Sequence, residues 1–125
     1  MERILGIGGA FFKARDPQAL AAWYREHLGL PVEVGQTYGS LKSQHAGEET
    51  VWSTFPFDTA YFGRADQSCM INYRVRDLDA MLAQLRAAGA SVDERMEEYE
   101  NGRFGWASDP EGNRFELWES HETPR

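Results

Sequence analysis

The chain has 125 residues, of which 42% are hydrophobic, so it can fold as a single domain with a core that needs no disulfide. Its one cysteine, Cys69, excludes an intramolecular disulfide, and no apolar run approaches the roughly 18 residues of a membrane span. The net charge of −7 argues against binding to nucleic acid or to anionic membranes. We therefore expect a cytoplasmic protein.

Two segments, residues 16–28 and 77–88, have the apolar spacing of amphipathic helices. Each begins with an aspartate, which is a good N-cap, and the first continues with Pro17, which suits the first helical position. Gly29 and Gly89 follow the two segments, and glycine commonly ends a helix. The sequence therefore predicts two helices of similar length, one in each half of the chain.

The surroundings of the two helices are also alike. A basic-x-basic-Asp tetrad precedes each helix, at residues 13–16 and 74–77, and closes an apolar strand. Further strands are expected at residues 31–35, 38–42, 50–55, 91–99, 103–109 and 113–119. Each half is thus a β-α-β-β-β unit, an internal repeat of about sixty residues. The polar residues 63–68 suit a linker, and the acidic run 93–100 suits a solvated edge.

The clearest turn is residues 109–113, whose sequence DPEGN is typical of a three-residue hairpin loop. Pairing the two ends of this loop predicts the strand register: Ser108 with Arg114, Trp106 with Glu116, and Phe104 with Trp118. Phe115 and Leu117 then share one strand face, which we expect to lie against a helix. Glu116 and Trp118 point to the opposite, concave face.

The same alternation assigns residues from other strands to the concave face. The candidate ligand-binding residues are Phe11, Trp52, Met70, Asn72, Phe104, Trp106, Glu116 and Trp118. A wall of aromatic and thioether groups with one carboxylate is typical of sites for small organic molecules. The aromatic residues would equally suit a protein core or a dimer interface, so that alternative stays open.

Three segments carry a family resemblance: residues 7–30 (IGGAFFKARDPQALAAWYREHLGL), 70–89 (MINYRVRDLDAMLAQLRAAG) and 105–119 (GWASDPEGNRFELWE). Their order and spacing resemble the vicinal oxygen chelate superfamily of glyoxalases, bleomycin-resistance proteins and dioxygenases. The resemblance implies an α+β fold in which two βαβββ modules form a curved, cup-like mixed sheet with helices packed outside. It implies one domain over residues 1–125, with modules of about 1–62 and 69–119, and a homodimer.

Metal-dependent members of this superfamily bind one divalent ion through four side chains, typically His, Gln or Glu. The resemblance places the four positions on Gly9, on Met70, near residues 50–52, and on Glu116. Glycine has no side chain and a thioether is a poor ligand for such ions, so only Glu116 fits. His27, His45 and His121 lie in a helix, a polar loop and the tail. We therefore expect no metal ligands and no cofactor.

Glu116 is the one candidate catalytic residue. In an aromatic surround its carboxyl group would be partly desolvated, which raises the pKa and suits a general base. Alternatively, Glu116 pairs with Arg74, Arg103 or Arg114 and only ties strands together.

Three candidate functions follow from these observations. We favour a metal-free, small-molecule-binding protein. The alternatives are a glyoxalase-like, metal-dependent lyase or isomerase that uses Glu116, and a dimeric structural domain whose cup is filled by its own side chains.

Overall fold

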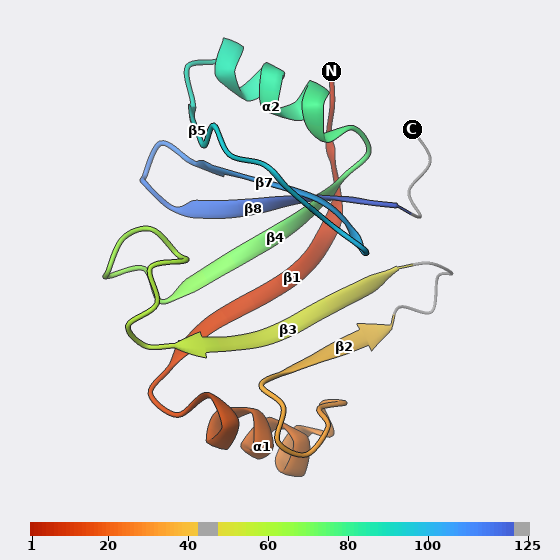
Figure 1. The fold of residues 1–125 in the computed structure, drawn as a ribbon, viewed down its shortest axis with the longest axis vertical. Coiled ribbons are helices and arrows are strands. Elements are labelled where there is room, and N and C mark those ends of the chain that lie inside the picture. Colours follow the sequence, from red (N-terminus) through yellow and green to blue (C-terminus); the bar gives the residue numbers. More distant parts are fainter. Residues whose placement is uncertain (43–47, 122–125) are drawn as a thin grey trace. The chain divides into compact units, whose positions relative to one another are not determined.

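The computed structural model describes residues 1–42 and 48–121 (Figure 1). The chain forms two compact units. We call Gly8–Met70 the N-terminal unit, and Met1–Ile7 together with Ile71–Arg125 the C-terminal unit. The first strand, β1 (Ile4–Ala14), is continuous and contributes residues to both units. Neither helix among the described residues is long and apolar enough to cross a bilayer.

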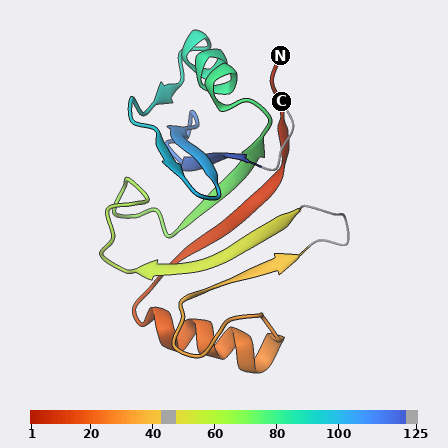
Figure 2. The same ribbon diagram turned by 45° about the vertical axis from the view of Figure 1, so that its right-hand side comes forward.

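In the N-terminal unit, β1 is followed by α1 (Pro17–Leu28), β2 (Tyr38–Lys42) and β3 (Glu49–Pro56). The central strand β3 pairs in parallel with β1 and antiparallel with β2, which gives the order β2-β3-β1 (Figure 2). The helix packs on one face of these strands through buried residues that include Ala21 and Trp52.

Most of β4 (Cys69–Val75) belongs to the C-terminal unit, which begins its second segment at Ile71. The unit continues with α2 (Leu78–Ala87), β5 (Ser91–Val92), β6 (Glu97–Tyr99), β7 (Gly102–Ser108) and β8 (Arg114–Ser120). Its strand order is β4-β8-β7-β5, and β6 also pairs with β7. The β4–β8 pair is parallel and the β7–β8 pair is antiparallel. The buried core between α2 and these strands consists of Val75, Leu78, Met81, Leu82 and Leu117.

Both helices begin and end where the sequence predicts. The Asp16 carboxylate accepts a hydrogen bond from the amide of Ala19 at 3.0 Å, and Asp77 does the same for Ala80 at 3.1 Å. Gly29 adopts the left-handed conformation with φ 69° and caps the first helix. The prediction of an α+β fold with mixed strand pairing and a helix on one side of each module is confirmed.

The register predicted for the 109–113 hairpin is also confirmed, pair by pair. The Asp109 amide donates to the Asn113 carbonyl at 3.0 Å, and Gly112 has φ 83°, a value that side chains disfavour. The Asp109 carboxylate additionally accepts from the Glu111 and Asn113 amides at 2.9 Å each. This loop fixes which residues of β7 and β8 lie opposite each other.

Two predicted strands are wrong in part. Residues 31–35 make one isolated bridge, Val32 to Gly39, because Val32 turns into the core under α1 while Val34 is 86% exposed. Residues 91–99 form two short strands, since residues 93–96 leave the ladder. The acidic run has no alternating apolar face that would keep it paired along its length.

The expected linker at residues 63–68 packs against the N-terminal unit. The Lys13 ammonium group donates to the carbonyls of Arg64 and Ala65 at 3.3 and 3.1 Å and lies 5.5 Å from the centre of the Phe62 ring. Gln67 is 6% exposed and its side chain donates to the Cys69 carbonyl. The segment is therefore part of the unit that precedes it.

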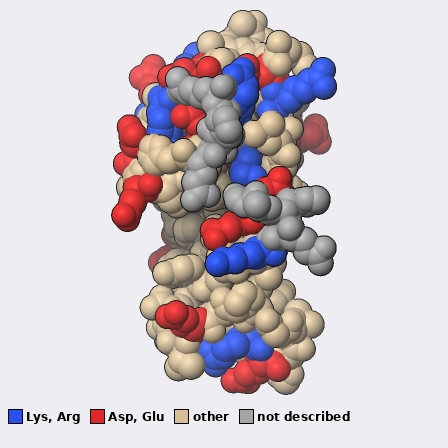
Figure 3. Space-filling model, turned by 90° about the vertical axis from the view of Figure 1, so that its right-hand side faces the viewer, with Lys and Arg blue, Asp and Glu red and all other residues tan. Residues whose placement is uncertain are grey.

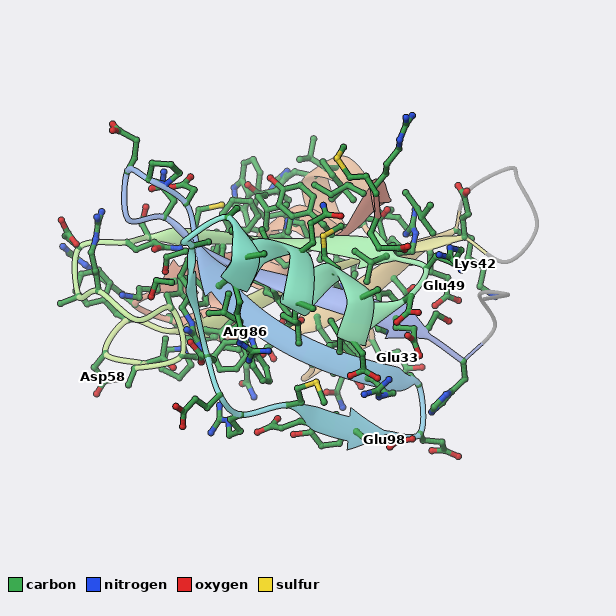
Figure 4. The ribbon with its side chains drawn as sticks, turned by 90° about the horizontal axis from the view of Figure 1, so that it is seen from above. Glu33, Lys42, Glu49, Asp58, Arg86 and Glu98 are labelled. Atoms are coloured by element: carbon green, nitrogen blue, oxygen red, sulfur yellow. The ribbon has the colours of Figure 1, made fainter. Side chains whose placement is uncertain are left out.

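Replacing Asp77 by alanine should lower the free energy of unfolding by about 1 kcal/mol, because the Ala80 amide loses its acceptor at the start of α2. The control is Asp58→Ala, in the exposed turn after β3 (Figure 4), which should cost less than about 0.5 kcal/mol. Urea denaturation followed by circular dichroism measures both. Equal losses in the two variants would contradict a capping role.

Candidate functional site

The centre of the site is the Glu116 carboxylate, on the face of β8 opposite to α2. Glu116 is 3% exposed, and the register places it between Asn72 of β4 and Trp106 of β7. Its Oε1 accepts a hydrogen bond from Asn72 Nδ2 at 2.6 Å, and its Oε2 accepts from Trp106 Nε1 at 2.9 Å. Three neighbouring strands thus meet in one polar cluster, which we call the Glu116 triad (Asn72, Trp106 and Glu116).

Burial of a carboxylate is costly unless its oxygens receive hydrogen bonds. Trp106 is fully buried and its indole N–H can only donate, so Oε2 of Glu116 must be an acceptor. The Asn72 amide nitrogen likewise donates to Oε1. Both carboxylate oxygens therefore act as acceptors in this arrangement.

The remaining polar atom of the triad has no partner. Asn72 is 2% exposed, and its Oδ1 is a buried acceptor without a hydrogen bond among the described residues. Turning the amide over would bring Oδ1 against Oε1 of Glu116, so two acceptors would face each other. The orientation of Asn72 is therefore fixed by Glu116, and one buried acceptor remains unsatisfied.

Two guanidinium groups lie over the Trp106 ring. The Arg95 carbon Cζ is 5.1 Å and that of Arg114 is 5.8 Å from the ring centre, which is cation–π distance. The Arg114 charge is matched by Asp93 through two hydrogen bonds of 3.0 and 2.9 Å. Residues 93–96, which we call the strap, are fastened by the Asp93 amide donating to the Trp106 carbonyl at 2.9 Å.

Arg86 of α2 also holds the strap, because its guanidinium donates to the Asp93 carbonyl at 3.0 Å (Figure 4). The interpretation of residues 93–100 as a solvated edge is thus wrong at Asp93, which lies against the triad. Further along, Glu98 of β6 has a side chain that is 66% exposed, as expected for an edge. Figure 3 shows acidic and basic side chains interspersed on one face of the molecule.

A pair of stacked rings continues the same strand face. Phe104 and Trp118 have centroids 5.8 Å apart and planes that differ by 10°. The Trp118 indole donates to the Asn101 carbonyl at 2.9 Å. It also packs against Gly102, where the Cβ of any other residue would lie 2.5 Å from Nε1 of Trp118. Beside them, a hydrogen bond to Glu97 raises the pKa of Tyr99, so this hydroxyl stays protonated at neutral pH. The predicted faces of β7 and β8 are confirmed.

The predicted position of Trp52 is wrong. Trp52 packs under α1 in the core of the N-terminal unit, 4.5 Å from the Tyr24 ring centre. It therefore lies on the helix side of β3. Phe11 lies on the opposite face of β1, where its ring is 5.5 Å from that of Phe55. Met70 is 1% exposed and alternates with Asn72 along β4, as predicted.

An aromatic cluster in the N-terminal unit was not predicted. Phe55 stacks on Tyr61 with ring centres 5.2 Å apart and meets the edge of Phe62, which is fully buried. The sequence signal is the aromatic density of residues 55–62 (FPFDTAYF), which lie between the strand expected at residues 50–55 and the linker expected at residues 63–68. Together with Phe11, these rings fill the strand face opposite to α1 with the unit's own side chains.

Two of the three arginines considered as partners of Glu116 bind other carboxylates: Arg114 binds Asp93, and Arg103 binds Asp79. Arg103 binds Asp79 at 2.8 Å and approaches Glu119 at 3.7 Å, and the Asp79 hydrogen bond raises the pKa of Arg103. Glu119 in turn accepts from the Leu78 amide at 2.8 Å, at the start of α2. Arg103, Asp79 and Glu119 thus form a second polar cluster, which holds the start of α2 against β7 and β8.

The residues at the family's metal positions do not fit a metal. At Gly9 a Cβ would lie 2.7 Å from the Phe11 ring, so that ring fills the space a ligand side chain would need. Met70 offers only a thioether, and both oxygens of Glu116 already accept N–H hydrogen bonds. Among residues 1–42 and 48–121, no three His, Cys, Asp or Glu side chains are grouped to hold a metal ion.

The histidines and the cysteine do not join the site. The His27 ring lies tilted against that of Trp23 on α1, with ring centres 4.9 Å apart. His121 lies 3.1 Å from the Tyr99 carbonyl, and His45 is outside the described residues. Burial raises the pKa of the Cys69 thiol, so at neutral pH it is protonated and a poor nucleophile.

Comparison with known proteins identifies the family. A family model described as "Glyoxalase-like domain" matches residues 9–118. The chain belongs to this family. The resemblance to the vicinal oxygen chelate superfamily is thereby confirmed, whereas no curated protein matches the chain in sequence.

Solved structures show the same fold. A variant of the Streptomyces coelicolor methylmalonyl-CoA epimerase, in complex with 2-nitronate-propionyl-CoA, aligns with a TM-score of 0.74 at 19% identity over 95% of this chain and 99% of that chain. The Mycobacterium tuberculosis methylmalonyl-CoA epimerase aligns with a TM-score of 0.63 at 21% identity, over 94% of this chain and 89% of that chain. A glyoxalase/bleomycin resistance protein/dioxygenase superfamily member from Vibrio splendidus 12B01 aligns with a TM-score of 0.61 at 12% identity, over 96% of this chain and 100% of that chain.

Two replacements of Glu116 should separate charge from hydrogen bonding. In Glu116→Gln the Asn72 amide can turn over, so that Oδ1 accepts from the new amide while the remaining oxygen accepts from Trp106. The free energy of unfolding should therefore change little. Glu116→Leu leaves the buried N–H donors of Asn72 and Trp106 without an acceptor, and it should lower the free energy of unfolding by about 1–3 kcal/mol more. Chemical denaturation measures the difference, and equal costs would rule out the triad as described.

Proposed function

We propose that this glyoxalase-like protein binds a small organic molecule and works without the family's metal centre. The observation that carries the proposal is the Glu116 triad, a buried carboxylate held by two N–H donors beside an aromatic stack. Such a mixture of apolar wall and few fixed polar groups suits ligand sites. The epimerase structures with CoA compounds indicate that this fold accommodates small organic ligands.

The metal-dependent lyase or isomerase is less well supported. It needs about three protein ligands with an open position, and Gly9 and Met70 supply none suited to the hard or borderline divalent ions of this family. Glu116 remains the candidate for any proton transfer, because it is the only carboxylate among the eight candidate ligand-binding residues. A homodimer in the cytoplasm belongs to the same proposal, and sedimentation velocity tests the dimer.

The self-filled structural domain has support in only one place. The strand face of the N-terminal unit opposite to α1 is packed with the unit's own rings, including the fully buried Phe62. In the C-terminal unit the corresponding face contains an unsatisfied acceptor, Asn72 Oδ1, which a self-sufficient core would avoid. We therefore place the ligand on the C-terminal unit.

Protein purified without chelators or metal-affinity resin should contain far less than one zinc, nickel, iron or manganese ion per chain. The reason is that none of the metal positions except Glu116 offers a suitable ligand. Elemental analysis by mass spectrometry measures this directly. Stoichiometric metal that is lost in Glu116→Leu would overturn the metal-free proposal in favour of the lyase or isomerase.

A thermal-shift screen of small organic compounds should find ligands that stabilise the protein, by about 2.7 kcal/mol at about 100 times Kd. Glu116→Gln should reduce or abolish that shift while leaving the unliganded protein folded. Glu26→Gln is the matched control, because its carboxylate lies exposed on α1 with only a 3.5 Å ion pair to Arg25. A screen without any stabilising compound would favour the structural domain.

A further inference from the structure

The two indole N–H groups at the triad and the Arg114 guanidinium already have partners. The indole N–H of Trp106 binds Glu116, and that of Trp118 binds the Asn101 carbonyl. The Arg114 guanidinium gives two hydrogen bonds to Asp93. The group left over is an acceptor, Asn72 Oδ1, directly beside a carboxylate. Around Asn72 Oδ1 the triad therefore offers an acceptor beside a carboxylate, which complements a ligand group that donates hydrogen bonds.

The Asn72 amide cannot turn over to present a donor in place of Oδ1 while Glu116 accepts from its Nδ2. A reversed Asn72 amide would place two acceptors against each other at the present 2.6 Å separation. An acceptor that is buried and unpaired costs about 1–3 kcal/mol. A ligand that supplies an N–H there recovers part of that cost, which gives the site a reason to prefer such a ligand.

Arg95 supplies a cation at the Trp106 ring, next to the polar atoms of the triad. The Arg95 guanidinium lies 5.1 Å from the centre of the Trp106 ring, although the Arg95 side chain is 62% exposed. Its ion pair with Glu97 is long, at 3.5 Å, and exposed, so it contributes little. Trp106 itself is fully buried. Arg95 can therefore leave at small cost, and its departure uncovers the part of the ring that its guanidinium covers.

We propose that the triad is a site for a protonated nitrogen on an apolar or aromatic body, and that Arg95 occupies the Trp106 ring until such a ligand displaces it. This inference rests on the proposed function and names the ligand class. The ammonium or amidinium group donates to Asn72 Oδ1 and lies beside the Glu116 carboxylate. Its apolar body replaces the Arg95 guanidinium on Trp106. The nearby Arg114 does not repel it strongly, because Asp93 balances that charge.

The test titrates benzylammonium, benzyl alcohol and benzoate into the protein and follows the Trp106 indole N–H by two-dimensional NMR. Benzylammonium should shift this signal and bind most tightly, benzyl alcohol more weakly, and benzoate least. Arg95→Gln should tighten benzylammonium binding about two- to five-fold, the value of one exposed cation–π contact. Arg95 lies at the surface, so this variant leaves the core unchanged.

The control is Arg64→Gln, which changes the net charge equally at an exposed ion pair with Asp66 in the N-terminal unit. A gain as large as that of Arg95→Gln would overturn the displacement model, because it would reflect the overall charge alone. Equal binding of benzyl alcohol and benzylammonium would overturn the cation preference. If only neutral or anionic compounds bind, and do so through Glu116, this inference fails while the proposed function stands.

Discussion

The buried carboxylate of Glu116 is the constraint around which the C-terminal unit is arranged. A charged group that is 3% exposed is tolerated only where hydrogen-bond donors surround it. Two donors come from the strands on either side of β8, so strand register and burial of the charge depend on each other. A one-residue slip would turn Glu116 toward α2 and Leu117 away from the core. The hydrogen bonds of this carboxylate thus stabilise one register of β4, β8 and β7 over the others.

The hairpin loop explains why so much of this unit could be predicted from the sequence. The DPEGN loop sets its own length and conformation by local chemistry, with Gly112 at φ 83°. Once the loop is known, counting outward places Trp106 opposite Glu116 and Phe104 opposite Trp118. The helices were equally predictable, because the aspartate caps and the terminal glycines act within a few residues of the chain.

The sequence was a poorer guide where neighbours distant in the chain decide. Trp52 sits in a strand whose alternating residues are all compatible with burial, so either face could take the indole. What decides is the room beneath α1, where Ala21 and Tyr24 accept the ring. Likewise, the Asn72 amide and the Trp106 indole could be seen to share a face, but their hydrogen bonds to one carboxylate depend on rotamers. The position of Arg95 on Trp106 depends on the path of an irregular strap.

The metal positions show how the family's scaffold can change its chemistry. If the protein works without the family's metal, as we propose, a buried carboxylate at this position needs another source of positive or hydrogen-bond-donating groups. Here the N–H groups of Trp106 and Asn72 take that role, and the Phe11 ring fills the space at Gly9. Restoring one ligand, such as a histidine at position 9, would therefore not restore a metal site. The Phe11 ring would have to move, and the triad would have to release Glu116 from two hydrogen bonds. The N–H donors that stabilise this buried carboxylate are thus the same groups that oppose metal binding by its oxygens.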